Sequence, residues 1–261
     1  MPSIRRSQAL AGPSPLAPRL VLGLVWLLAA ASDDLAPALQ DLDVLDREAY
    51  LNLRAEASTA RVREVLAAHP DSYDVAWRLA RSTFKQAYST SEAKQKMALG
   101  DEGYQASQRA LKLRPDGVEA LYWGTCAMGM YAQSAGVMRA IMDGVAGKIQ
   151  DGFERAVRVD RRYNEAGPLE ALGRYLYEVP WPLRDRQRAL ALFEEAARIA
   201  PHKLRVQAFL GDAYRALDRP TEARRAYQRC ARAAIRREVE IDAPIWQAHC
   251  TRTLGEWTKG P

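Results

Sequence analysis

Apolar residues recur at helical spacing along most of the chain, and one spacing returns several times. Its clearest copy has a small, an aromatic and a small residue followed by proline, at intervals of four, three and five: Ala189, Phe193, Ala196 and Pro201. The first three share one face of a helix, and the proline ends that helix. Looser copies of the same spacing begin at Ser58, Gly103, Ile149 and Ala223. A pattern of this kind predicts helical hairpins of about 34 residues, the tetratricopeptide repeat.

A second apolar stripe precedes most of these helices and carries a small residue, which lets two backbones approach closely. The small residues are Ala80, Gly124, Gly173 and Gly211. From the small residue to the next stripe is 12 residues in the last copy, but 23, 25 and 16 residues in the others. Extra residues therefore enter between paired helices, and in a solenoid they lie along one edge. The sequence predicts an all-α, tetratricopeptide-like helical-hairpin solenoid with elongated helices and inserted edge loops.

The three insertions differ in composition. Residues 89–100 are polar and predict longer helices rather than a loop. Residues 131–152 are apolar and interrupted by glycine, and we expect them to pack over another part of the molecule. Residues 177–182 contain two prolines, which exclude helix and place Trp181 in a rigid turn.

The N-terminus has the pattern of an export signal, because arginines precede an apolar run at 20–31 that ends in small residues. The run is shorter than the roughly 17–25 residues needed to span a bilayer, which favours cleavage near Ala31 over an uncleaved anchor. We expect a periplasmic or otherwise exported protein. The expected segments are a signal peptide (1–31), a flexible acidic start (32–46), a tetratricopeptide-like repeat domain (47–240), and a C-terminal capping helix and tail (241–261).

Composition narrows the class of protein further. Of 261 residues, 48% are hydrophobic and 27% charged, which excludes a wholly disordered or collagen-like chain. The formal net charge is +6, and removal of residues 1–31 leaves 35 basic and 32 acidic residues, a net of +3. Glutamates are interleaved with the arginines of 215–237. That mixture favours a solvated helix face over a nucleic-acid-binding strip.

Local motifs for catalysis are absent from the sequence. It contains no G-x-x-x-x-G-K-[ST], H-E-x-x-H, C-x-x-C or G-x-S-x-G. We therefore predict a protein that is not an enzyme and has no catalytic residues, no metal ligands and no cofactor. An enzyme whose residues are dispersed through the insertions is the less favoured alternative.

Two cysteines near the C-terminus are candidates for a disulfide. Cys230 lies on the last repeat helix and Cys250 on the following amphipathic stretch, 243–257. Antiparallel helices joined near Pro244 would bring the two together, and helix rotation decides whether they come within bonding distance. The alternative is that each packs as a small apolar residue. Cys126 is expected to be a buried free thiol.

An ordered set of short runs resembles two related families. The runs are Trp77–Arg81, Ala110–Pro115, Glu119–Gly124, and Leu172–Tyr177 with the proline-containing turn. Together they resemble the TatT-like T component of tripartite ATP-independent periplasmic (TRAP) transporters and the regulator of microtubule dynamics proteins, over roughly residues 60–235. The export signal favours the former. That resemblance implies a helical repeat protein that forms a small homo-oligomer, contacts a solute-binding protein and offers a pocket to an apolar solute.

The first helices of the hairpins are expected to present a concave binding surface of aromatic and arginine side chains. The candidates are Trp77, Arg81, Phe84, Leu121, Thr125, Met128, Arg174, Tyr177 and Trp181. Such a surface suits a carboxylate-bearing apolar ligand or a protein segment. The same spacing is typical of core, so we expect about half of these positions to be packing residues.

The sequence therefore predicts a non-catalytic periplasmic binding or scaffold protein, an accessory to solute transport that contacts a solute-binding protein or a small apolar carboxylate. The alternative is a generic tetratricopeptide scaffold of the cell envelope that binds proteins and no small molecule.

Overall fold

The computed structural model describes residues 35–52, 54–236 and 240–257, and within these ranges the chain forms helices and connecting turns without any strand. The predicted signal peptide, 1–31, lies outside the described residues. By internal contacts the chain divides into residues 1–41 and 42–261, and only the start of the first helix represents the first unit. The second unit holds the repeats.

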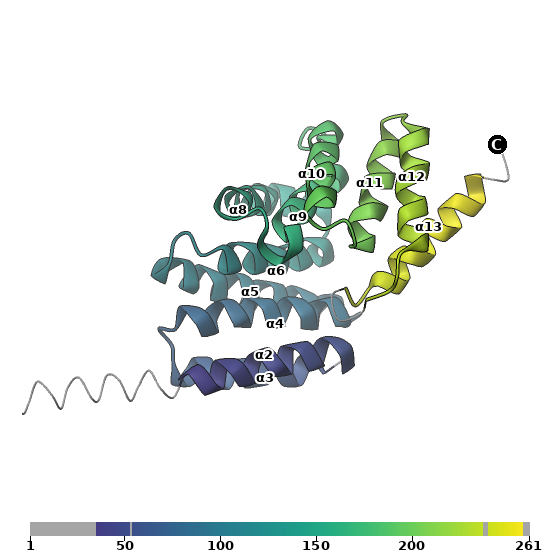
Figure 1. The fold of residues 1–261 in the computed structure, drawn as a ribbon. Coiled ribbons are helices and arrows are strands. Elements are labelled where there is room, and N and C mark those ends of the chain that lie inside the picture. The colour runs from purple at the N-terminus through teal and green to yellow at the C-terminus, as the bar shows by residue number, and fades with distance from the viewer. Residues whose placement is uncertain (1–34, 53, 237–239, 258–261) are drawn as a thin grey trace, which may run out of the picture. The chain divides into compact units, whose positions relative to one another are not determined.

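The helices pair in chain order, with α7 as a short insertion and α13 following the last pair (Figure 1). Their bounds are α2 (Leu35–Asn52), α3 (Ala55–Ala68), α4 (Tyr73–Ser89), α5 (Ala93–Leu113), α6 (Val118–Ala135), α7 (Val137–Met142), α8 (Val145–Val159), α9 (Tyr163–Glu178), α10 (Arg186–Ile199), α11 (Leu204–Ala216), α12 (Pro220–Arg232) and α13 (Ala243–Trp257). The predicted all-α, tetratricopeptide-like fold is confirmed.

Each hairpin packs mainly on its neighbours in sequence. Helix α4 contacts α5 and α6, α6 contacts α8, α8 contacts α9, and the series continues through α10, α11 and α12 to α13. Figure 1 shows α4, α5 and α6 stacked side by side and α11 beside α12. A helix in such an array is stabilised by adjacent repeats, so the core runs along the molecule instead of gathering at one centre.

Glycines mark the points where neighbouring helices cross closely. A Cβ added at Gly173 would lie 2.6 Å from the Phe193 ring, and one added at Gly211 would lie 2.5 Å from the Tyr227 ring. At Gly124 an added Cβ would overlap the side chain of Ser107. The close approach predicted from these glycines is confirmed, because no larger residue fits between the helices.

The insertions take three forms. The one at 89–100 lengthens α4 and α5 as predicted, and α5 has 21 residues. The one at 131–152 bends at Gly136 and Gly144, whose φ angles of 93° and 70° favour glycine. It packs only in part: Ala140, Val145 and Ala146 are buried, whereas Met138 and Met142 are 68% and 76% exposed. Of the insertion at 177–182, Tyr177 and Glu178 are still helical and end α9, and only 179–182 form the predicted non-helical turn, with a cis Trp181–Pro182 bond.

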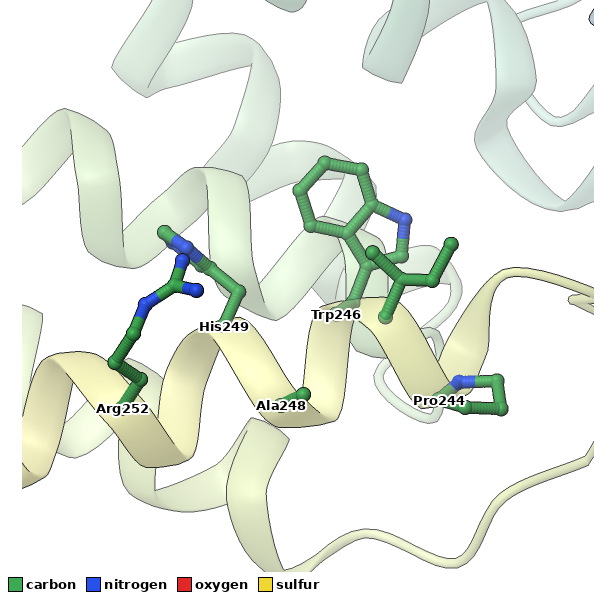
Figure 2. Close-up of a pocket in the computed structure, with 6 residues that line it drawn as sticks. Pro244, Trp246, Ala248, His249 and Arg252 are labelled. Carbon is green, nitrogen blue, oxygen red and sulfur yellow. The ribbon is translucent and has the colours of Figure 1, made fainter.

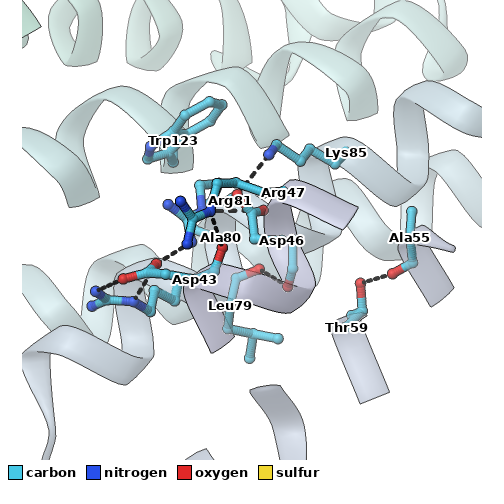
Figure 3. Close-up of polar contacts among 12 residues, drawn as sticks. Asp43, Asp46, Arg47, Ala55, Thr59, Leu79, Ala80, Arg81, Lys85 and Trp123 are labelled. Atoms are coloured by element: carbon cyan, nitrogen blue, oxygen red, sulfur yellow. Dashed lines mark hydrogen bonds and ion pairs between the residues drawn. The ribbon is translucent and has the colours of Figure 1, made fainter. Parts of the chain in front are cut away.

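The prediction that 32–46 is a flexible acidic segment is wrong from Leu35 onward, because helix α2 begins at that residue. Asp43 and Asp46 lie three residues apart on α2 and so face the same way. The Arg81 guanidinium contacts Asp43 at 2.8 Å and Asp46 at 3.3 Å, and the Lys85 ammonium contacts Asp46 at 2.7 Å (Figure 3). These carboxylates join α2 to α4, so α2 is part of the array, as the first of the described helices, and the expected domain boundary at residue 47 falls within it.

The C-terminal helix α13 covers the last hairpin. Ala243, Cys250 and Thr253 are its buried side chains. Cys230 and Cys250 form a disulfide with their Cα atoms 6.1 Å apart, so the structure selects the bonded alternative of the two left open by the sequence. Among the described residues, no helix is both long enough and apolar enough to cross a membrane.

Candidate binding face

Aromatic side chains connect the first helices of the second, third and fourth hairpins. Phe84 on α4 lies 5.7 Å from Trp123 on α6, measured between ring centroids. The Trp123 indole N–H donates to the hydroxyl of Tyr163 on α9, at 2.9 Å. Tyr122 packs edge-on against Tyr163 at 5.7 Å. The helices α4, α6 and α9 thus share one run of ring contacts.

The same side of the array continues through α9 and α11 to α13. The Arg174 guanidinium lies 4.4 Å from the centroid of the Phe209 ring. Phe209 in turn packs edge-on against Trp246 of α13 at 4.9 Å. Asp212 of α11 accepts a hydrogen bond from the Tyr227 hydroxyl at 2.6 Å and lies 3.1 Å from Nε2 of His249. We call these two runs of contacts, which meet on α9, the first-helix face. It consists of Phe84, Trp123, Tyr163, Arg174, Phe209, Asp212, Trp246 and His249. Trp123 and Phe209 are its buried members, 8% and 4% exposed, and the others are partly exposed.

A buried cluster of charges lies between α9, α11 and the segment before α13. Glu170 is paired with the Lys203 ammonium at 3.0 Å and with the Arg205 guanidinium at 2.5 Å. The Glu240 carboxylate accepts from the backbone N–H of Leu204 at 2.8 Å and of Arg205 at 3.0 Å. That carboxylate occupies the N-terminus of α11, where the free N–H groups and the helix dipole favour an anion.

Burial and pairing move the pKa values of this cluster in opposite directions. Burial by itself raises the pKa of Glu170, but Arg205 and Lys203 outweigh it and hold the pKa below its usual value. Burial dominates at Glu240 and raises its pKa despite Arg205. Perturbed groups of this kind also occur at catalytic sites. Here the side chains of Glu170, Lys203 and Glu240 are 7%, 5% and 4% exposed and are paired within the protein, so the cluster joins α9 to α11 and to the segment before α13.

Three of the predicted face residues are packing residues. Leu121, Thr125 and Met128 of α6 are only 2%, 5% and 6% exposed. The Thr125 hydroxyl donates to the Leu121 carbonyl at 2.6 Å. Helix α6 is covered by α4, α5, α8 and α9, so it has apolar residues on all sides. Their spacing therefore does not show which side of α6 belongs to the first-helix face.

The two predicted arginine anchors, Arg174 on the face and Arg81 on α4, are already paired. Arg81 binds Asp43 and Asp46, and its guanidinium lies 4.9 Å from the centroid of the Trp77 ring. Arg174 forms ion pairs with Glu178 and, at 3.9 Å, with Asp212. The neighbouring arginines hold the pKa of Asp43 below its usual value, although burial alone raises it. A ligand carboxylate would therefore have to displace a carboxylate of the protein.

The remaining predicted residues divide between the face and its surroundings. The Tyr177 hydroxyl donates to the Asp212 carbonyl at 3.4 Å, at the border of the face, and Trp77 is buried beneath Arg78 and Arg81. Trp181 is 84% exposed on the turn after α9. No ring contact or hydrogen bond joins Trp181 to the first-helix face within the described residues.

The sequence did not point to α13 as part of a binding surface. An open groove of about 500 Å³ runs along this helix, lined by Pro244, Ile245, Trp246, Ala248, His249 and Arg252. Figure 2 shows Trp246 and His249 projecting from the same side of α13. The amphipathic pattern of 243–257 predicted only that one side of this helix packs on the last hairpin. The sequence signal for a groove on the opposite side was a tryptophan, a histidine and an arginine at helical spacing.

Comparisons with solved structures agree with this fold. The chain is similar to TTC0263, a thermophilic TPR protein of Thermus thermophilus, with 18% identity, a TM-score of 0.61, and coverage of 82% of this chain and 98% of that one. It is also similar to pilF of Pseudomonas aeruginosa, with 15% identity, a TM-score of 0.56, and coverage of 87% and 94%. These identities establish likeness of fold alone.

Sequence comparison identifies the family. A comparison with curated proteins finds no match. The family model described as Regulator of microtubule dynamics protein 1-3 matches residues 39–180, which is more than half of the chain. The protein therefore belongs to the regulator of microtubule dynamics protein 1-3 family.

Proposed function

We propose that the protein is a non-catalytic scaffold that binds a segment of a partner protein along its first-helix face. The observation that carries the proposal is that side-chain contacts on this face join each first helix to the next. One run joins Phe84 on α4 to Tyr163 on α9, and a second joins Arg174 on α9 to Trp246 on α13. Aromatic side chains provide large contact area at low entropic cost, which suits recognition of a protein segment.

A protein segment fits this face better than a small apolar carboxylate. The arginines that would bind a free carboxylate, Arg81 and Arg174, are neutralised by carboxylates of the protein. The hollow on α13 is a groove open to solvent, whereas a pocket for a drug-sized ligand encloses most of its surface. An extended partner could bury ring area along the face without breaking those ion pairs.

A narrower role, an exported accessory to solute transport that contacts a periplasmic solute-binding protein, is part of the same proposal. Its support is the signal-like pattern of residues 1–31 and the resemblance to the T component of TRAP transporters. Cell fractionation with N-terminal sequencing of the mature protein tests it. Recovery in the exported fraction with a start near residue 32 supports the role, and recovery of the intact N-terminus in the cytosol contradicts it.

Photo-crosslinking of the protein in living cells tests the scaffold function. A benzophenone amino acid is placed at Tyr88 or Tyr177, beside the first-helix face, and in a control at Ala191, which is exposed on the second helix α10. We expect one defined protein adduct from the two face positions and none from the control. Equal labelling from all three positions, or a co-purified small molecule without any protein adduct, contradicts the proposal.

A further inference from the structure

The groove on α13 combines an apolar floor with a single cation. Ile245, Ala248 and Arg252 are spaced three and four residues apart, so they share one side of the helix. Ile245 is 63% exposed, and Ala248 and Arg252 are also exposed. Ile245 and Ala248 therefore leave apolar area in water along the groove, and an apolar side chain of a partner can bury it.

The walls of this groove are held in place by contacts to the rest of the array. The Trp246 indole N–H donates to Asp242 at 2.7 Å, while the ring packs on Phe209. His249 is fixed by Asp212 at 3.1 Å, and the next residue, Cys250, is bonded to α12. Since the groove is formed before binding, little conformational entropy is lost when it is occupied.

Arg252 differs from the two arginines that the sequence predicted as anchors. Arg81 and Arg174 are paired with carboxylates, whereas Arg252 has no ion-pair partner in the described part of the chain. A guanidinium that is free and stands at the edge of an apolar groove matches a carboxylate, which it can bind with two hydrogen bonds.

We propose that the α13 groove binds a bulky apolar side chain of the partner segment and that Arg252 binds an acidic residue next to it. This inference rests on the proposed scaffold function and specifies the chemistry of one end of the partner. The occupant is a protein segment because the groove adjoins the first-helix face: Trp246 and His249 belong to both. A segment leaving the groove therefore passes directly onto that face.

A random peptide display library, selected on the oxidised protein, tests the proposal. We expect enriched peptides with Leu, Ile, Met or Phe beside Asp or Glu. Arg252→Glu should weaken them by at least about tenfold, because a charge-assisted contact is lost and like charges meet. The same variant should select Lys or Arg at the acidic position. Arg224→Glu, a charge reversal at an exposed position of α12, is the matched control and should leave binding unchanged.

A second variant separates this inference from the scaffold function. Ala248→Trp fills the groove at an exposed position and should abolish binding of the selected peptides without altering thermal unfolding. Two results overturn the groove assignment and keep the scaffold function. One is enrichment of peptides that lack an acidic residue. The other is peptides that bind the Arg252→Glu and Ala248→Trp variants normally but do not bind the Tyr177→Ala variant. Absence of any enrichment counts against both. Binding of decanoate in the groove without peptide binding assigns it to a small amphiphile and also overturns the inference.

Discussion

The charges buried between α9 and α11 are tied to each other, so single residues there control stability. Glu170 is the carboxylate that faces both Lys203 and Arg205. Removing one partner of a buried ion pair leaves the opposite charge without compensation, which costs more than the pair contributes when intact.

The variant Glu170→Gln should therefore lower the free energy of unfolding by about 3 kcal/mol at pH 7. The pKa of Glu170 is lowered in the folded protein, so its stabilising contribution is present above the unfolded value of 4.5 and is lost as pH falls below it. The difference in the free energy of unfolding between the wild-type protein and the variant should shrink below pH 4.5. Urea unfolding at several pH values measures it, and Glu178→Gln, at an exposed site on the same helix, should change stability by less than about 1 kcal/mol. A difference that is constant with pH contradicts the assignment.

Cys126 gives a second prediction at the scale of one residue. Cys126 is a free thiol as predicted, but it is partly exposed and not fully buried. Desolvation raises the pKa of this thiol to about 12, so at pH 8 almost none of it is thiolate. Iodoacetamide should leave Cys126 unmodified in the folded protein and label it rapidly in denaturant, as read by mass spectrometry. Rapid labelling of the folded protein would show that the thiol is accessible.

At the scale of elements, the close crossing of neighbouring helices depends on small residues at defined points. Helix α6 offers a matched pair of glycines. A Cβ at Gly124 would overlap Ser107 of α5, whereas one at Gly129 has no neighbour within 4 Å.

Gly124→Ala should destabilise the protein by about 2 kcal/mol, because the added methyl group forces α5 and α6 apart. Gly129→Ala should stabilise it by roughly 0.5–1 kcal/mol, since alanine loses less backbone entropy in a helix. Thermal or urea unfolding of the two variants measures both effects. Equal effects from the two variants would mean that helix propensity, and not the close contact between α5 and α6, determines the change in stability.

At the scale of the whole molecule, the repeat spacing of the sequence was sufficient to predict the fold but not to predict which residues form the first-helix face. Residues such as Phe193 and Tyr227 follow a strict stripe because each meets one glycine on one partner helix. On α6 the same logic failed: Leu121, Thr125 and Met128 are buried by helices on all sides, so periodicity carried no direction.

Long-range ion pairs explain the other errors. The acids of 32–46 hid a short apolar stripe, Leu35, Leu39 and Leu42, and the partners of Asp43 lie 35 and 38 residues further along the chain. A reading based on local composition cannot identify such pairs, so α2 looked like a solvated segment. The binding role of α13 was missed for the same reason, because Trp246 and His249 take their positions from α11.

The bond between Cys230 and Cys250 also limits how far the protein can be stretched. Twenty residues separate the two cysteines, and an extended chain spans about 3.4 Å per residue. If the molecule is pulled by its ends until every helix has unravelled, the oxidised chain should stop about 60 Å short of the reduced one, once the 6.1 Å between the Cα atoms is allowed for. Force spectroscopy with and without reductant would show this shortfall in contour length. A partner that binds the α13 groove would then be attached to a part of the chain that tension cannot fully extend.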